Sequence, residues 1–368
     1  MPDRVVVLRG PGDVAIREEN PAPLGERQFR VRTLYSGISA GTELSYVKGT
    51  NPYLAARFDT ELGLFRDGEP STRYPLERLG YMEAGQVVQS RSPVVAEGVT
   101  VAMAYGHRTG YSADPLVDRI VPLPSGFDPL LGVFVAHMGP ICANGLLHAA
   151  ADVHGTDVRG LGDGVRGRRV AVTGAGVVAL LTALFARHHG AASVVVLDPT
   201  PQRRAVASAL GLDTLDPNAE DPAVVLKSRW RHGADDRGAD VVFQCRGQAS
   251  ALHLALRLLR PQGTVVDLAF YQDGADAVRL GEEFHHNGLT VRCAQIGRVP
   301  RGLSPLWDRD RLSAETVELL TTYGRTVREH LVSAVVPFDE APALLADLAA
   351  RRRHELQVVL SCESCQLP

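Results

Sequence analysis

Several features are scarce in this 368-residue chain, and each shortage excludes a class of protein. No apolar run approaches the ~20 residues of a membrane-spanning helix. The first residues lack the charged, apolar and small-residue regions of a secretion signal. Lysine and arginine number 39 against 42 acidic residues, without a basic block, so charge favours neither a nucleic-acid nor a membrane partner. We therefore expect a cytoplasmic protein whose partner is a small-molecule substrate.

Cysteine is also scarce, because the five cysteines are odd in number and too scattered for a disulfide framework. Cys142, Cys245 and Cys293 are isolated, and we expect them to be small buried apolar residues. Cys362 and Cys365 form a C-x-x-C near the end of the chain without a second pair. We expect a disordered tail there, with a redox or metal role as the alternative.

A complete strand–turn–helix–strand unit is present in the middle of the chain. Residues 170–173 form an apolar, β-branched run typical of a buried parallel strand. Gly174 permits a tight turn, and Gly176 lets backbone amides approach a pyrophosphate at a helix N-terminus. The third glycine of G-x-G-x-x-G is Ala179, and Asp198 follows the next strand at the spacing of a ribose-binding carboxylate. The unit predicts dinucleotide binding.

The residues around this turn indicate which dinucleotide is bound. Val177 and Val178 begin the helix, where free amides favour an anion. Asp198 can accept hydrogen bonds from both ribose hydroxyls and would repel a 2′-phosphate, which favours NAD over NADP. Arg203 or Arg204 could offset that repulsion, although both also fit the exposed face of the next helix.

The pattern of elements predicts an α/β protein with two domains. Residues 1–150 are β-rich, with short strands separated by turn residues. Strands and helices then alternate between 151 and 302, which is typical of a Rossmann doubly wound parallel sheet. Residues 303–368 break that rhythm, and we expect them to return and complete the first domain.

Residues 51–79 are poor in strand pattern and form a long excursion. Its aromatic residues Tyr53, Phe58 and Phe65 either shape a cleft or form a small satellite core under the loop.

This organisation resembles the medium-chain dehydrogenase/reductase superfamily, the zinc-type alcohol dehydrogenase-like proteins, along essentially the whole chain. Residues 5–18 (VVVLRGPGDVAIRE) are similar to its first hairpin, and residues 338–360 to its closing helix and strand. Residues 29–44 (FRVRTLYSGISAGTEL) and 80–87 (GYMEAGQV) are similar to its two metal-ligand loops. The resemblance implies that the β-rich domain is the GroES-like catalytic domain.

The metal ligands of that family are missing from the matched positions. Where zinc-dependent members carry Cys, His–Glu and Cys or Glu, this chain has Ser39, Tyr81–Met82 and Gly139. The four-cysteine structural zinc lobe is also missing from the sequence. The segments SGISAGTE and FHHNGLTVRCAQIGRV further resemble a zinc-less branch that includes the bacteriochlorophyllide hydroxyethyl dehydrogenases. We therefore expect no zinc.

Without a metal, hydroxyl or imidazole groups must handle the proton. Tyr81 replaces a metal-ligand histidine and is either a proton donor or an aromatic packing residue. Thr42 matches a proton-relay position or bonds its own turn. Ser39 is a catalytic hydroxyl or fills the cysteine's space, and His137 precedes the turn that normally feeds the metal site. Glu43, Glu83 and His107 are weaker candidates, more typical of salt-bridged, solvated or structural groups.

The same resemblance implies further contacts to the cofactor. Cys245 and Arg246 match a turn beside its nicotinamide half, and Arg246 either touches a phosphate or lies at the surface. The strand end formed by Leu268, Ala269 and Phe270 is expected to border the nicotinamide ring.

The resemblance implies a zinc-independent, NAD(H)-dependent oxidoreductase acting on an alcohol or ketone of a small polar or secondary-metabolite substrate. Two alternatives stay open: reduction of an imine, iminium or activated enone, and a non-catalytic dinucleotide-binding protein. The family also implies a homodimer, with residues 280–291 near the interface.

Overall fold

The protein is described by a computed structural model that covers residues 2–272 and 274–362. The chain divides into two compact units, one formed by residues up to His137 and from Val332 onward, the other by Met138–Leu331. The expected boundaries at 150 and 302 therefore need correction. The helices α2 (Met138–His154) and α7 (Arg309–Thr326) pack against each other and against α3 (Val177–His188), so both belong to the second unit.

The second unit contains a six-stranded parallel sheet with the order β12-β11-β10-β13-β14-β15. Apolar residues occupy both faces of its central strands, which explains their uninterrupted apolar sequences. The strands are β10 (Arg169–Thr173), β11 (Ser193–Leu197), β12 (Asp213–Leu215), β13 (Ala239–Gln244), β14 (Leu259–Asp267) and β15 (Thr290–Cys293). The predicted Rossmann sheet is confirmed.

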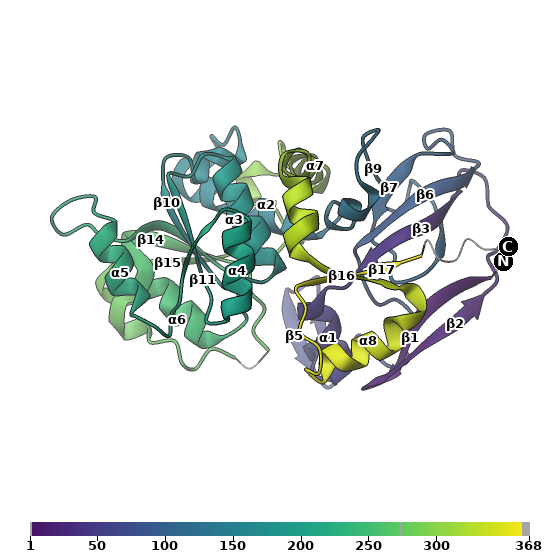
Figure 1. Cartoon of the computed structure of the whole chain (residues 1–368), viewed down its shortest axis with the longest axis horizontal. Helices are drawn as coiled ribbons and strands as arrows, with labels where there is room; N and C mark the ends of the chain where they lie inside the picture. Colours follow the sequence, from purple (N-terminus) through teal and green to yellow (C-terminus); the bar gives the residue numbers. More distant parts are fainter. Residues whose placement is uncertain (1, 273, 363–368) are drawn as a thin grey trace. The chain divides into compact units, whose positions relative to one another are not determined.

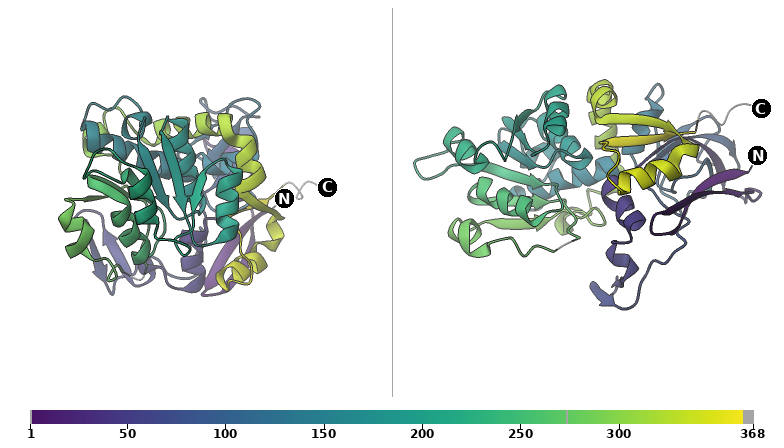
Figure 2. Two further views of the ribbon diagram at one scale, coloured as in Figure 1. Left: turned by 60° about the vertical axis from the view of Figure 1, so that its left-hand side comes forward. Right: turned by 60° about the horizontal axis from the view of Figure 1, so that its bottom comes forward.

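Helices cover both faces of this sheet, as Figure 2 shows. The strand order reverses between β10 and β13, so right-handed crossovers place α3 and α4 (Pro201–Ala209) on one face. They place α5 (Pro222–Arg229) and α6 (Ala249–Leu258) on the other face (Figure 1). The point of reversal is where sheets of this kind bind their ligands.

The first unit is built on a seven-stranded sheet in which β16-β17-β3-β6-β7-β9 run in order and β8 pairs with β3. A separate hairpin, β1 with β2, packs against α8, which also contacts α1. The elements are β1 (Asp3–Gly10), β2 (Asp13–Glu19), β3 (Phe29–Gly37), α1 (Ala40–Lys48), β6 (Glu83–Ser90), β7 (Thr100–Met103), β8 (Gly110–Ala113), β9 (Val121–Pro122), β16 (Val332–Pro337), α8 (Ala341–Ala349) and β17 (Gln357–Ser361). Residues from Val332 onward complete the first domain, because β17 pairs with β3.

The excursion 51–79 contains a two-stranded hairpin, β4 (Ala56–Asp59) with β5 (Leu64–Asp67). The Phe65 ring lies 5.7 Å from Tyr53 and 5.2 Å from Phe58, centroid to centroid. The aromatic residues therefore form a small cluster of their own. The strands were missed in the sequence because each has only four residues.

Two predictions for cysteines are wrong. Cys293 is exposed, because it ends the edge strand β15. Cys362 is buried in the core beside α8, and its amide donates to the Leu34 carbonyl, so it does not lie in a disordered tail. Cys142 is buried as expected, and Cys245 is partly buried. Cys365 lies outside the described residues.

In the described part of the chain, no helix is long and apolar enough to cross a membrane.

Candidate functional site

The glycine turn lies at the carboxyl ends of β10 and β13, where the strand order of the second unit reverses. Gly174 has φ +98°, and a Cβ there would lie 3.2 Å from Arg246 Cβ. The Cys245 amide donates to the Thr173 carbonyl at 3.0 Å. The turns that carry Gly174 and Arg246 are therefore in contact.

The amino end of α3 is open for a ligand. Gly176 is its N-cap, with φ −83°, and no side chain caps the helix. A Cβ on Gly176 would have no heavy atom within 4 Å. The first amides of a helix, here including Val177 and Val178, have no acceptor within the helix. These features fit a pyrophosphate at the helix N-terminus.

Asp198 follows β11 and braces this turn. Its side chain is buried; Oδ2 accepts from the Ala175 amide at 2.9 Å and Oδ1 from the Thr200 amide at 2.8 Å. Each carboxylate oxygen keeps a second lone pair for a ribose hydroxyl. Arg204 donates to the Asp198 carbonyl and pairs with Asp216, whereas Arg203 is exposed on α4.

The loops after β13 and β14 are also in contact. The Leu268 amide donates to the Gln244 carbonyl at 2.9 Å. A Cβ on Gly247 would lie 2.3 Å from the Phe270 carbonyl oxygen, so only glycine fits there. Ala269 donates its amide to Asp267 at 2.9 Å, and the Phe270 side chain is half-exposed. The strand end 268–270 is thus held at the same edge as the glycine turn.

A polar network that the sequence analysis missed supports this loop. Tyr271 donates its hydroxyl to Asp267 at 2.8 Å, and the Gln244 amide donates to the Tyr271 oxygen at 3.0 Å. Burial raises the pKa of Asp267, although the Ala269 amide and the Tyr271 hydroxyl oppose the shift. No local signal marks the network, because its members come from two strands and a loop.

The four catalytic candidates of the first unit lie together. Ser39 Oγ is hydrogen-bonded to the Tyr81 hydroxyl, and Thr42 also bonds that hydroxyl with its side chain. The Tyr81 ring meets the His137 ring edge-on, 4.5 Å between centroids. Ser39 is buried, Tyr81 and His137 are partly buried, and Thr42 is exposed. We call Ser39 and Tyr81 the hydroxyl pair.

The electrostatics of the hydroxyl pair keep Tyr81 protonated. Burial raises the pKa of Tyr81; the Ser39 and Thr42 hydroxyls oppose the shift, and the nearby Glu43 and Glu83 carboxylates add to it. Tyr81 is therefore a neutral phenol near pH 7. A neutral phenol can donate its proton to a substrate oxygen.

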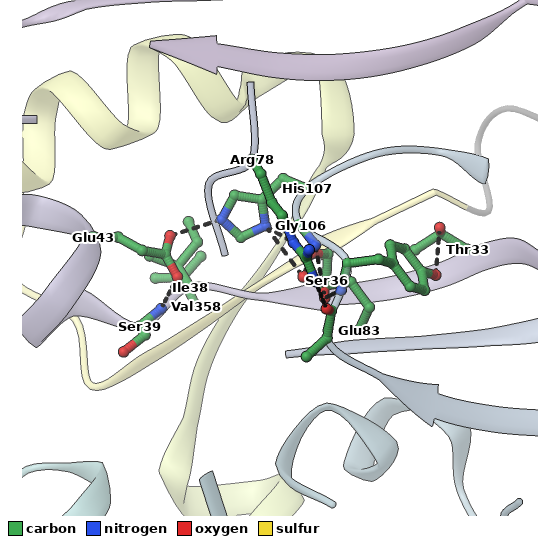
Figure 3. A network of polar contacts seen from close by, with 12 residues as sticks. Thr33, Ser36, Ile38, Ser39, Glu43, Arg78, Glu83, Gly106, His107 and Val358 are labelled. Carbon is green, nitrogen blue, oxygen red and sulfur yellow. Dashed lines mark hydrogen bonds and ion pairs between the residues drawn. The ribbon is translucent and has the colours of Figure 1, made fainter. Parts of the chain in front are cut away.

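A fully buried network connects to the hydroxyl pair through the backbone (Figure 3). His107 Nε2 lies 2.7 Å from Glu43 Oε2, and His107 Nδ1 lies 2.7 Å from Ser36 Oγ. Ser36 Oγ in turn donates to Glu83 at 3.0 Å. Of these residues, the sequence had placed Glu43, Glu83 and His107 among the weaker candidates, and Ser36 was missed.

The residues at the family's metal positions do not fit zinc. Ser39 and Tyr81 offer hydroxyls that bond each other, and Met82 is fully buried in the core. A Cβ on Gly139 would lie 2.1 Å from Thr316 Cγ2, so a glutamate or cysteine there would require a local shift. Thiolate and imidazole are the ligands that hold this ion in proteins.

One group of metal-type side chains does come together elsewhere in the described chain. The ligand atoms of His253, Glu282 and Glu283 lie within 4.8 Å of one another. Arg257 pairs with Glu283 and Arg279 with Glu282, which neutralises both carboxylates.

Comparison with known proteins gives a consistent family. The model of the zinc-binding dehydrogenase family matches residues 177–308. A D-guloside 3-dehydrogenase of Shigella flexneri is 25% identical over 352 residues, covering 92% of this chain and 93% of the relative. Galactitol-1-phosphate dehydrogenase of Escherichia coli has the same fold, with TM-score 0.75 at 18% identity, over 97% of this chain and 99% of that one.

A Sinorhizobium meliloti 1021 protein solved in complex with NADP also has this fold. Its TM-score is 0.72 at 21% identity, and the match covers 98% of this chain and 99% of that one.

Proposed function

We propose that the chain is a zinc-independent, NAD(H)-dependent member of the zinc-type medium-chain dehydrogenase/reductase superfamily, to whose members it is similar. It transfers a hydride between nicotinamide and a secondary alcohol or ketone of a polar substrate. Its similarity to these dehydrogenases indicates an NAD(P)-dependent oxidoreductase that resembles alcohol and polyol dehydrogenases. The absence of zinc and the choice of NAD are the parts that we propose.

The observation that carries the proposal is the hydroxyl pair at the matched metal positions. Zinc in this family polarises the reacting oxygen as a Lewis acid. In this chain a neutral phenol, Tyr81, takes that place, with hydroxyls of Ser39 and Thr42 bonded to it. A positioned phenol can supply the proton that an alkoxide needs.

The chain's own residues then carry the proton. Bound nicotinamide supplies or takes up the hydride. In the reducing direction, Tyr81 donates its hydroxyl proton to the substrate oxygen as the carbonyl becomes an alcohol. Ser39 and Thr42 donate hydrogen bonds to the phenolate oxygen that remains, which lowers the cost of that charge. Oxidation of an alcohol runs through the same atoms in reverse.

NAD is favoured over NADP by the surroundings of Asp198. Its carboxylate is buried against the glycine turn, and a 2′-phosphate would add a second negative charge beside it. Arg204 is already engaged by Asp216 and the Asp198 carbonyl. Only the exposed Arg203 remains on α4 to offset such a phosphate.

A sugar, glycoside or polyol is the substrate class that we propose. The D-guloside 3-dehydrogenase matches over nearly the whole length, and partial matches include an L-galactonate-5-dehydrogenase. Their names give dehydrogenation at position 3 of a guloside and at position 5 of galactonate. A site of hydroxyl groups and an imidazole suits such substrates through hydrogen bonding.

The test is turnover of NADH with a panel of keto-sugars, and of NAD with glycosides and polyols, using metal-free protein. Tyr81→Phe should lower kcat by about a hundredfold or more, the typical loss of a proton donor, with NADH affinity unchanged. Tyr111→Phe is the matched control, because Tyr111 is a partly buried tyrosine bonded to Asp118 in the same unit.

Three outcomes would contradict the proposal in different ways. One zinc per chain, lost together with activity on chelation, would overturn the zinc-free mechanism. Full activity of Tyr81→Phe on imines or enones would favour reduction of iminium-like groups, which need no proton donor at the heteroatom. NADH binding without turnover of any substrate would indicate a non-catalytic binding protein.

We also propose a homodimer. The edge strand β15 has one unpaired side in the described chain, and both Val291 of this strand and Leu280 of the preceding segment are exposed. Pairing with a second copy would cover this edge. Light scattering that gives the mass of one chain at micromolar concentration would contradict it.

A further inference from the structure

Three ionisable side chains are buried behind the hydroxyl pair, where ions are costly. Glu43 and His107 are each 1% exposed, and Glu83 is fully buried. Removing a charge from water costs several kcal/mol unless it is paired and hydrogen-bonded. Here every member has a partner within hydrogen-bond distance, from a different element of the fold (Figure 3).

The hydrogen bonds assign the protons in this network. Glu83 accepts from the amides of Tyr105 and Gly106, at 2.8 and 3.1 Å, and from the Ser36 hydroxyl. A serine has a single proton, so Ser36 must accept from His107 Nδ1. The other ring nitrogen faces the Glu43 carboxylate. With Glu43 and Glu83 ionised, both ring nitrogens are donors, and His107 is an imidazolium between two carboxylates.

Electrostatics agree with this assignment. Burial by itself lowers the pKa of His107, but the attraction and hydrogen bond of Glu43, together with Glu83, outweigh it and raise the pKa above the ordinary 6.5. The charged groups that face the ring are Glu43 from α1 and Glu83 from β6. The nearby phenols of Tyr81 and Tyr105 are kept neutral by burial.

Glu43 holds the backbone of Ser39 at the start of α1. Ser39 is the N-cap of α1, yet its side chain makes no cap hydrogen bond. A serine at this position usually accepts from an amide of the first turn. Here Glu43 Oε1 accepts from the Ser39 amide at 2.7 Å. The Ser39 hydroxyl caps no amide of the first turn and bonds Tyr81 instead.

His107 also fixes the other member of the hydroxyl pair. A Cβ on Gly80, which precedes Tyr81, would lie 2.6 Å from the His107 ring, so backbone and ring are in direct contact. The His107 amide donates to the Leu79 carbonyl at 2.7 Å. The His107 ring thus holds Ser39 through Glu43, and the ring and amide of His107 contact the 79–80 backbone that precedes Tyr81.

We propose that the Glu43–His107 ion pair is the positioning device of the reaction, in which it orients the Ser39 and Tyr81 hydroxyls in place of a metal. Neither side chain touches the reacting atoms in this scheme. The charge state of His107 is a property of the protein alone, whereas its effect on turnover rests on the proposed function of Tyr81.

The first experiment is a ¹⁵N NMR titration of the histidine rings in the whole wild-type protein, with His107→Gln to assign the signal. We expect both ring nitrogens of His107 to be protonated at pH 7. A neutral ring at pH 7 would overturn the ion pair, whatever the enzyme's activity.

The second experiment compares Glu43→Gln with Glu77→Gln, an exposed glutamate of the same unit. Glu43→Gln should make His107 neutral at pH 7 and lower kcat more than tenfold, because a displacement of about 1 Å can cost a hundredfold. NADH affinity should not change. Glu77→Gln should change neither the charge of His107 at pH 7 nor kcat.

Three results separate the possible failures. A lower melting temperature of Glu43→Gln with unchanged kcat would mean that the ion pair only stabilises the fold, which would overturn the proposal. A kcat of Glu43→Gln that recovers when zinc is added would also overturn it. An imidazolium in the wild type together with full activity of Tyr81→Phe would refute the role of Tyr81 and, with it, the positioning role, while the charge assignment would stand.

Discussion

Gly176 offers a test of cofactor binding that leaves the fold intact. Its φ of −83° is open to any residue, and a Cβ there would have no heavy atom within 4 Å. Gly176→Ala is therefore sterically neutral in the free protein. The same space lies at the amino end of α3, where we expect the pyrophosphate to approach the backbone.

The expected change in stability is small because two terms oppose each other. Replacing glycine at a compatible position stabilises by about 0.4–1 kcal/mol through the unfolded chain. Alanine is a poorer N-cap than glycine, by roughly 0.5–1 kcal/mol. The free energy of unfolding should thus change by less than about 1 kcal/mol. The dissociation constant of NADH should rise at least about tenfold, or 1.4 kcal/mol.

The assays are fluorescence titration with NADH and thermal unfolding without ligand. Gly174→Ala is the control, because at φ +98° and 3.2 Å from Arg246 Cβ it should lower stability by about 1–3 kcal/mol. An unchanged NADH affinity in a normally folded Gly176→Ala protein would refute the placement of the pyrophosphate. A large loss of stability in Gly176→Ala would refute the steric reasoning.

Three further predictions follow from the geometry. Asp198→Ala leaves the buried amide of Ala175 and the partly buried amide of Thr200 without their acceptor, so we expect a loss of about 1–3 kcal/mol for the Ala175 amide in urea unfolding, together with weaker NADH binding; unchanged stability would contradict these hydrogen bonds. Because Glu43 and Glu83 outweigh burial and raise the pKa of His107 above 6.5, its stabilisation is complete below pH 6.5 and is lost as the pH rises through the folded-state pKa. The melting temperature should therefore fall as the pH rises, and it should fall less in His107→Gln than in the wild type. An equal change of melting temperature with pH in the two proteins would contradict the assignment. Dialysis against a chelator should leave NADH-linked activity unchanged, and a loss restored by zinc would contradict the choice of proton donor.

The cofactor-binding unit could be predicted in detail because its signals are local. The apolar strands, the glycines at 174 and 176 and the helix after them lie within one stretch of about 30 residues. The structure confirms the parallel sheet and places Gly174 at the reversal point of its strand order. Periodicity and backbone freedom act over such distances, so the sequence reveals them.

The domain boundaries could not be predicted in the same way. Helices α2 and α7 carry no local sign of which unit they join, since each is an amphipathic or apolar helix by sequence. Their packing against each other depends on a close approach at Gly139, where only glycine leaves room for Thr316. That fit is a tertiary property.

The candidate site of the first unit shows the same division. The sequence by itself determined which chemical groups were available: Ser39 and Tyr81 in matched loops, and no thiolate or imidazole at the family's metal positions. It could not determine the network behind them, because Ser36 meets Glu83 only through the register of β3 and β6. His107, which lies 64 residues after Glu43 in the sequence, then connects Glu43 to Ser36 and Glu83. Strand register, burial and the pairing of buried charges are set by distant parts of the chain, so only the tertiary structure decided which of these groups meet.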